Sequence, residues 1–178
     1  MKTLAFLSAA CLFAGAVAAP AQTPPPPPPA AAKSQAPAYV AAAGQSDLFE
    51  INSSRIAVRK AQNPAVRQFA QMLIDHHQKT TAATLAAARA AKVKTPPPPR
   101  LEAGATASIR ELERASGADF DRIYLGQQVP AHRAALDLHT AYSQGGDKAE
   151  LKASAASAVP IVQQHLDQAQ RLASGGGA

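Results

Sequence analysis

The sequence predicts an all-α protein built as a four-helix bundle. In several long segments apolar residues recur at spacings of three and four, as at Val66, Phe69 and Leu73, which is the period of a helix. No segment has the alternating apolar and polar residues of a strand. Prolines and glycines divide the chain into segments that are long enough for two helical hairpins.

Residues 1–18 are expected to form a secretory signal peptide. Lys2 precedes an apolar run that ends at residues 16–18, where two alanines flank a valine as signal peptidase requires. The run is shorter than the roughly 20 residues that a transmembrane helix needs. We therefore expect export to the periplasm or beyond and no transmembrane segment. Cys11 lies in this leader, so the mature chain has no disulfide, and lipidation of Cys11 is the less standard alternative.

Residues 19–45 are expected to form a disordered spacer. Prolines occupy positions 24–29, and alanine, serine and glutamine dominate around them. Such a segment forms extended polyproline and has little to bury in a core. A second proline run at positions 96–99 must end any helix that precedes it, because proline removes a backbone donor and clashes with the preceding turn.

The first hairpin is predicted from two helices with clear start signals. Ser46 is the expected N-cap of a helix over residues 46–61, with Asp47 and Glu50 placing negative charge in its first turn. Asn63 then caps a second helix over residues 64–91, which begins at Pro64.

Three further helices follow the second proline run. We expect a short helix over residues 101–115, a long one over residues 119–142 that ends before two glycines, and a last one that Asp147 caps and that reaches residue 173. The bundle would then span residues 46–173, followed by a flexible tail at residues 174–178. Two hairpins joined by a long connection with an extra short helix describe the ferritin-like topology with one crossover. A simple up-down bundle is the alternative.

Five side chains that bear chemistry fall on the inward faces of these helices: Glu50, His76, His132, His139 and His165. Imidazole and carboxylate are the groups with which helical bundles hold metal ions in their cores. Glu50 and His76 each lie about a dozen residues from the turn that joins the first two helices, so an antiparallel hairpin brings them to one level.

The level of His165 presents a difficulty. If the last turn is centred near Gly145, His132 and His165 differ in height by roughly 10 Å at the helical rise. Asp121 and Gln128 are then closer to the level of His165. An off-centre turn, a bend of the last helix at Pro160, or two separate polar layers would each account for the mismatch.

Two interpretations of these polar residues remain open. In the first, one transition metal ion, zinc, copper or iron, is held by a set of residues comprising Glu50, His76, His132, His165 and Asp121. In the second, the same side chains form a metal-free hydrogen-bonded network in an envelope interaction or stress-protection module. Asp75, His77 and His139 are interpreted as solvated or boundary positions.

Composition excludes several other functions. The net charge of +6 is scattered along the chain and aromatic residues are few, so nucleic acid is not an expected partner. A mild positive charge is compatible with association at an anionic envelope surface. No serine lies in the strand-turn-helix context of a hydrolase nucleophile, so nothing supports acyl transfer, and the sequence identifies no enzymatic activity.

The segment Asn63-Pro64-Ala65-Val66-Arg67-Gln68-Phe69-Ala70-Gln71-Met72 with Asp75-His76 resembles the central signature of a family of exported bacterial proteins. Members carry a ferritin-like helical domain of unknown function and are often labelled outer membrane proteins. Further matches are Ser116-Gly117, Phe120-Asp121, Tyr124, His132, Pro160 and His165-Leu166. The resemblance implies a ferritin-like bundle whose polar positions are Glu50, Asp75, His76, Asp121, His132 and His165. It supplies no function, and the sequence lacks the Glu-x-x-His pairs of di-iron ferritins.

Overall fold

The computed structural model describes residues 28–175. A short 3-10 helix η1 (Ala30–Lys33) precedes five α-helices, which are α1 (Ala36–Lys60), α2 (Pro64–Ala90), α3 (Ala103–Arg114), α4 (Gly117–Gly145) and α5 (Ala149–Ala173). No strand occurs in this part of the chain. The expected leader over residues 1–18, with the lipidation alternative at Cys11, lies outside the described residues.

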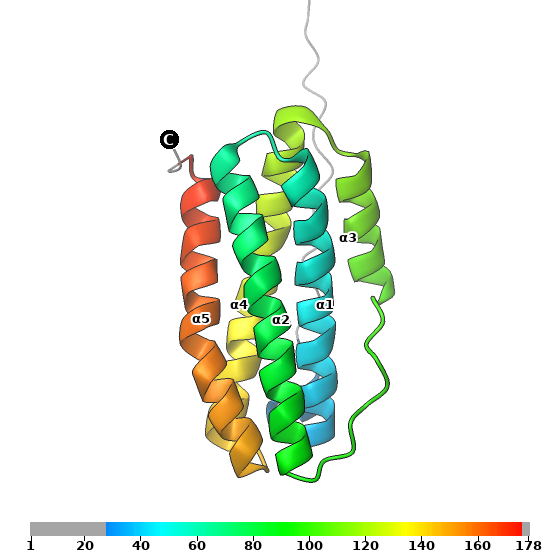
Figure 1. Ribbon diagram of the computed structural model, residues 1–178, viewed down its shortest axis with the longest axis vertical. Coiled ribbons are helices and arrows are strands. Elements are labelled where there is room, and N and C mark those ends of the chain that lie inside the picture. Colours follow the sequence, from blue (N-terminus) through cyan, green and yellow to red (C-terminus); the bar gives the residue numbers. More distant parts are fainter. Residues whose placement is uncertain (1–27, 176–178) are drawn as a thin grey trace, which may run out of the picture.

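Four long helices form the bundle, with α1 beside α2 and α4, and α5 beside α2 and α4 (Figure 1). The partners of each hairpin are antiparallel, while α2 and α4 run in the same direction. The connection between α2 and α4 therefore returns along the bundle, and it carries α3 against α1 and α4. The all-α four-helix bundle with a crossover is confirmed, and the simple up-down alternative is wrong.

The core consists of two apolar clusters separated by a polar layer. One cluster lies near the α1–α2 turn and includes Ile56, Phe69 and Tyr124. The other lies toward the opposite end and includes Tyr39 and Leu138. On each long helix the buried polar residues, except His139 of α4, lie between the residues of the two clusters. The polar groups therefore meet at one level inside the bundle.

Helix α1 begins at Ala36, ten residues before the expected N-cap at Ser46. The expectation of a disordered spacer is wrong for the part of residues 19–45 that the structure describes as helical. Ala36, Tyr39, Val40 and Ala43 form a buried stripe at helical spacing, and all four belong to the second apolar cluster. Alanine-rich composition concealed this stripe. Its consequence is that Asp47 lies in the middle of α1, at the level of the polar layer.

The ends of the helices agree with most of the predicted signals. The Asn63 side chain accepts a hydrogen bond from the Ala65 N–H at 2.8 Å and caps α2 as expected. Asp147 makes no side-chain cap on α5. Its carboxylate instead accepts from the Ala36 N–H at 2.9 Å, so it caps α1 from across the bundle. No helix within residues 28–175 is both long and apolar enough to cross a membrane.

Candidate metal centre

Three buried histidines from three different helices meet in the polar layer. His77 of α2, His132 of α4 and His165 of α5 each offer a ring nitrogen, and these nitrogens lie within 4.8 Å of one another. The ring centroids are 5.6 Å apart for His77 and His132, 5.3 Å for His77 and His165, and 5.4 Å for His132 and His165. All three side chains are at most 2% exposed. We call these residues the histidine cluster.

The second ring nitrogen of each imidazole in the histidine cluster has a hydrogen-bond partner. His77 Nδ1 donates to Asp47 Oδ1 at 2.8 Å, and His132 Nδ1 donates to the Gln128 carbonyl oxygen at 2.9 Å. His165 Nε2 is bonded to His76 Nδ1 at 2.8 Å. Metal-binding histidines are held in this way, since their other N–H is bonded to a carboxylate or a carbonyl that fixes the ring.

The remaining nitrogens of the cluster are bare. His77 Nε2, His132 Nε2 and His165 Nδ1 are buried and have no hydrogen-bond partner among the described residues. Leaving a buried polar atom unpaired costs about 1–3 kcal/mol, so three such atoms together require an explanation. A metal ion that accepted all three lone pairs would remove this cost.

Asp47 is held firmly behind His77. The hydroxyls of Thr80 and Thr81 both donate to Asp47 Oδ2, at 3.2 and 2.5 Å, while Oδ1 accepts from His77. The carboxylate is only 6% exposed. Its negative charge therefore acts on His77 with little screening by solvent.

The electrostatics keep two of the three imidazoles neutral. Burial, together with the nearby His77, lowers the pKa of His132 to about 3. Burial and the surrounding histidines lower the pKa of His165 to about 2. Burial also acts to lower the pKa of His77, but the hydrogen bond and charge of Asp47, with Glu50, outweigh it and raise that pKa. A metal ion at His77 Nε2 would displace this proton.

Glu50 lies beside the histidine cluster. Its Oε1 is 3.8 Å from His132 Nδ1, and neither carboxylate oxygen has a hydrogen-bond partner in the described chain. Burial, and then the charge of Asp47, raise the pKa of Glu50 to about 8. Without a bound cation this carboxyl is therefore protonated at neutral pH. Gln128 of α4 also belongs to the polar layer, and its side chain donates a hydrogen bond to the Ser53 hydroxyl at 3.1 Å.

The inward positions predicted for Glu50, His132 and His165 are confirmed. Of the three explanations for the mismatch in height, the structure supports an off-centre turn. The turn between α4 and α5 is centred near residue 147, because α4 ends at Gly145 and α5 begins at Ala149. His132 and His165 are then 15 and 18 residues from the turn, which leaves an offset of about 4.5 Å that side chains can span.

His77 is the residue that the sequence interpretation missed. It was expected at a solvated or boundary position, yet it is 2% exposed and central. It lies four residues after Leu73 and so continues the buried line Val66, Ala70, Leu73, which was visible in the sequence. His76, expected inside, is half-buried and contacts His165 from the edge of the layer.

Asp121 and His139 take other places. Asp121 accepts from the backbone N–H groups of Gln62 and Asn63 at 3.0 and 2.8 Å, so it ties α4 to the α1–α2 turn and is absent from the polar layer. His139 is 4% exposed rather than a boundary residue, and its Nδ1 is hydrogen-bonded to the Tyr39 hydroxyl at 2.9 Å. Asp75 is exposed, as expected.

Comparison with known proteins gives the family. Residues 21–172 match the family described as "Domain of unknown function (DUF4142)". The chain belongs to the DUF4142 family. The match includes all five α-helices of this DUF4142 protein except the last residue of α5, and it agrees with the resemblance to a family of unknown function seen in the sequence. No curated protein matches the chain.

A solved structure has a similar fold. The structure described as "CopM in the Cu(II)-bound form" aligns with a TM-score of 0.67 and 14% sequence identity, over 79% of this DUF4142 chain and 97% of that chain. At this identity the likeness establishes the helical fold.

Proposed function

We propose that this DUF4142 protein binds a single transition metal ion through His77, His132 and His165. The observation that carries the proposal is the convergence of three buried imidazoles, each of which offers a ring nitrogen within 4.8 Å of the others. On each ring one nitrogen is hydrogen-bonded and the other has no partner among the described residues. Glu50 Oε1 lies 3.8 Å from His132 Nδ1, and both oxygens of this buried carboxyl are without a hydrogen-bond partner in the described chain. It is the proposed source of a fourth ligand.

Copper(II) is the metal that we propose first, with zinc as its closest competitor. Imidazole nitrogens bind copper, zinc and iron, and divalent copper binds most tightly of the first-row metals at a given nitrogen and oxygen site. The protein with the similar fold, CopM, is described in a Cu(II)-bound form, which supports the same choice. The only cysteine is Cys11, in the expected leader, so the proposed site offers no thiolate that would favour copper(I).

The proposal places the protein in the cell envelope or outside the cell. Its basis is the leader expected over residues 1–18, which ends in small residues suited to signal peptidase. N-terminal sequencing of the protein from its native host should find a chain that begins at Ala19. Met1 on the abundant form, or a lipid on Cys11, would contradict export by this route.

Equilibrium dialysis with elemental analysis tests the metal proposal. Purified protein should retain a near-stoichiometric amount of copper or zinc, and His77→Ala or His132→Ala should abolish the retention. His139→Ala is the matched control, because it removes a buried histidine that is bonded to Tyr39 and is not in the histidine cluster. A wild-type protein that retains no metal, or an equal loss in all three variants, would contradict the proposal.

A metal-free polar network is the second candidate. The observation that favours it is that Asp47 of α1 already accepts hydrogen bonds from His77, Thr80 and Thr81 of α2. In that case chelator at neutral pH would leave the melting temperature unchanged. If a metal is bound, chelator lowers the melting temperature and added copper or zinc restores it.

A further inference from the structure

The histidine cluster has no direct contact with solvent. His132 and His165 are 0% exposed and His77 is 2% exposed. If these residues bind a metal, as proposed above, the ion must enter through an opening between the helices. The structure has a pocket that ends beside the cluster.

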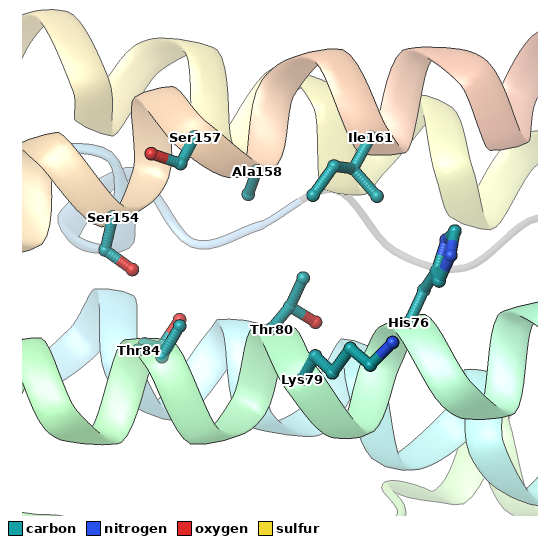
Figure 2. Close-up of a pocket in the computed structure, with 9 residues that line it drawn as sticks. His76, Lys79, Thr80, Thr84, Ser154, Ser157, Ala158 and Ile161 are labelled. Carbon is teal, nitrogen blue, oxygen red and sulfur yellow. The ribbon is translucent and has the colours of Figure 1, made fainter.

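This pocket lies between α2 and α5 and has a volume of about 310 Å³. Its walls carry side-chain hydroxyls from both helices, Thr80, Thr84, Ser154 and Ser157, between apolar side chains, and the exposed Lys79 also lines it. Figure 2 shows these groups on facing walls, with His76 rising from α2 toward α5 at one end. A lining of hydroxyl groups can replace some of the water around a hydrated cation as it moves inward.

His76 joins the pocket to the cluster. It lines the pocket, and its ring stacks on that of His165 with centroids 5.1 Å apart and planes 25° apart. Its Nδ1 is bonded to His165 Nε2 at 2.8 Å. Its Nε2 makes no hydrogen bond to the protein within residues 28–175. When His76 carries its proton on Nδ1 and donates it to His165 Nε2, His76 Nε2 has a lone pair that is available to an ion in the pocket.

We propose that His76 is an outer metal ligand through which copper(II) or zinc passes from the α2–α5 pocket to the histidine cluster. The ion binds His76 Nε2 first. As it moves past the pair, the proton of their hydrogen bond shifts from His76 Nδ1 to His165 Nε2, His165 Nδ1 loses its proton and His76 Nε2 gains one, so that His165 Nδ1 becomes a bare nitrogen for the ion. This inference rests on the proposed function, and it assigns His76 to the route of the metal rather than to the final site.

A second cavity is a less suitable route. It has a volume of about 550 Å³ and lies under residues 95–100, where Asp47, Thr81 and Thr84 line it. Asp47 already accepts bonds from His77, Thr80 and Thr81, so an ion there would meet the hydrogen-bonded Nδ1 side of His77. The bare Nε2 is the other nitrogen of that ring.

Rates of metal loading and extraction test the route. Copper(II), and separately zinc, is mixed with apo-protein in a stopped-flow instrument, and the loaded protein is then mixed with a chelator. The informative variant is His76→Asn, because the asparagine amide can occupy the position of Nδ1 and keep the bond to His165 while it removes Nε2. Ala83→Leu narrows the pocket from an exposed position on α2. Its matched control is Ala82→Leu, which is exposed on the same helix and does not line the pocket.

Both His76→Asn and Ala83→Leu should slow loading and extraction by about tenfold, the effect of losing one interaction in the transition state for passage. Equilibrium affinity should stay unchanged, and Ala82→Leu should behave as wild type. Faster extraction with unchanged loading in His76→Asn would mean that His76 only orients His165, and would overturn the inference. Slower loading in Ala41→Leu, which narrows the second cavity, but not in Ala83→Leu would also overturn it. If the wild-type protein binds no metal at equilibrium, the proposed function is wrong. If it binds metal normally but loading and extraction rates are unaltered in His76→Asn and Ala83→Leu, only the proposed route is wrong.

Discussion

At the scale of single residues, the site depends on what lies behind each ligand. The imidazoles of the histidine cluster are oriented by Asp47, by the Gln128 carbonyl and by His76, each at 2.8 or 2.9 Å. These contacts decide which ring nitrogen is left bare. The residues that surround the histidine cluster therefore determine which nitrogens can bind a metal.

Asp47→Asn should weaken metal binding by about tenfold or more, because it removes the charge that raises the basicity of His77. A competitive titration against a chelator of known affinity measures this change. Asp75→Asn is the control, since Asp75 is an exposed aspartate of α2 whose side chain accepts a hydrogen bond from Gln71 and is not in the polar layer. Equal affinities for the two variants would show that Asp47 does not support the site.

Glu50→Gln should change how stability depends on pH in metal-free protein. The pKa of Glu50 is raised from 4.5 to about 8, so its contribution to stability is complete below pH 4.5 and is lost as pH rises through about 8. Glutamine cannot ionise. We compare the melting temperature of the variant with that of wild type at pH 6 and at pH 9. From pH 6 to pH 9 this difference should shift in favour of the variant by a few degrees, or about 1 kcal/mol. The exposed Glu113→Gln should show no such pH-dependent gain.

At the scale of elements, the start of α1 is the main determinant of the lower half of the bundle. Its first turns supply Tyr39, which is fully buried, stacks on Tyr142 at 3.9 Å between centroids and bonds to His139. Asp147 holds the same end through the Ala36 N–H. This part of α1 closes the end of the core that lies opposite the α1–α2 turn.

Tyr39→Ala should destabilise the fold by about 3 kcal/mol or more, as expected for truncating a buried aromatic side chain. Unfolding by urea, followed by circular dichroism, gives the free energy. Gln35→Ala, at an exposed residue just before α1, should change stability little. If Tyr39→Ala were equally harmless, this segment would be a spacer after all.

At the scale of the whole molecule, four helices each bring polar groups to one level between two apolar clusters. The bundle holds these groups in a low-dielectric interior, which is why the pKa values of His132 and His165 are low. The arrangement keeps imidazole nitrogens neutral and available to a metal over the physiological pH range.

Metal-free protein should be most stable near pH 6.5 and lose stability on acidification. His132 and His165 have their pKa values lowered by burial from 6.5 to about 3 and about 2, so the unfolded chain binds more protons as pH falls below 6.5. Each of these two histidines then lowers the free energy of unfolding by about 1.4 kcal/mol for each pH unit of acidification. Between pH 6.5 and pH 4.5 the folded state holds one more proton on Glu50 than the unfolded state does, and this cancels the effect of about one histidine. Above pH 6.5 the raised pKa values of Glu50 and His77 reduce stability instead.

Urea unfolding from pH 4 to pH 9 in the presence of chelator measures this profile. The variant His132→Gln removes one titrating group, and its acid-side slope should be smaller by about one proton. An identical slope for wild type and variant would mean that His132 is not buried in its neutral form.

The sequence by itself determined the helical class, because the spacing of apolar residues three and four positions apart is a local property of the chain. It also determined the α1–α2 turn, since Asn63 and Pro64 act on their own backbone. The proline run ends the preceding helix but is compatible with both a crossover and an up-down path, so the tertiary structure decided the crossover. The inward positions of His132 and His165 followed from the same periodicity. These features depend on neighbours within about one helical turn.

Only the tertiary structure decided which residues meet. Whether His76 or His77 enters the core depends on how α2 is rotated against its neighbours, and the two side chains lie on adjacent flanks of one helix. The relative heights of His132 and His165 depend on the centre of the α4–α5 turn, because a shift of that centre by two residues changes their difference in height by about 6 Å. Helical periodicity assigns a residue to a stripe, whereas the position of that stripe against other helices is set by packing between segments far apart in the sequence.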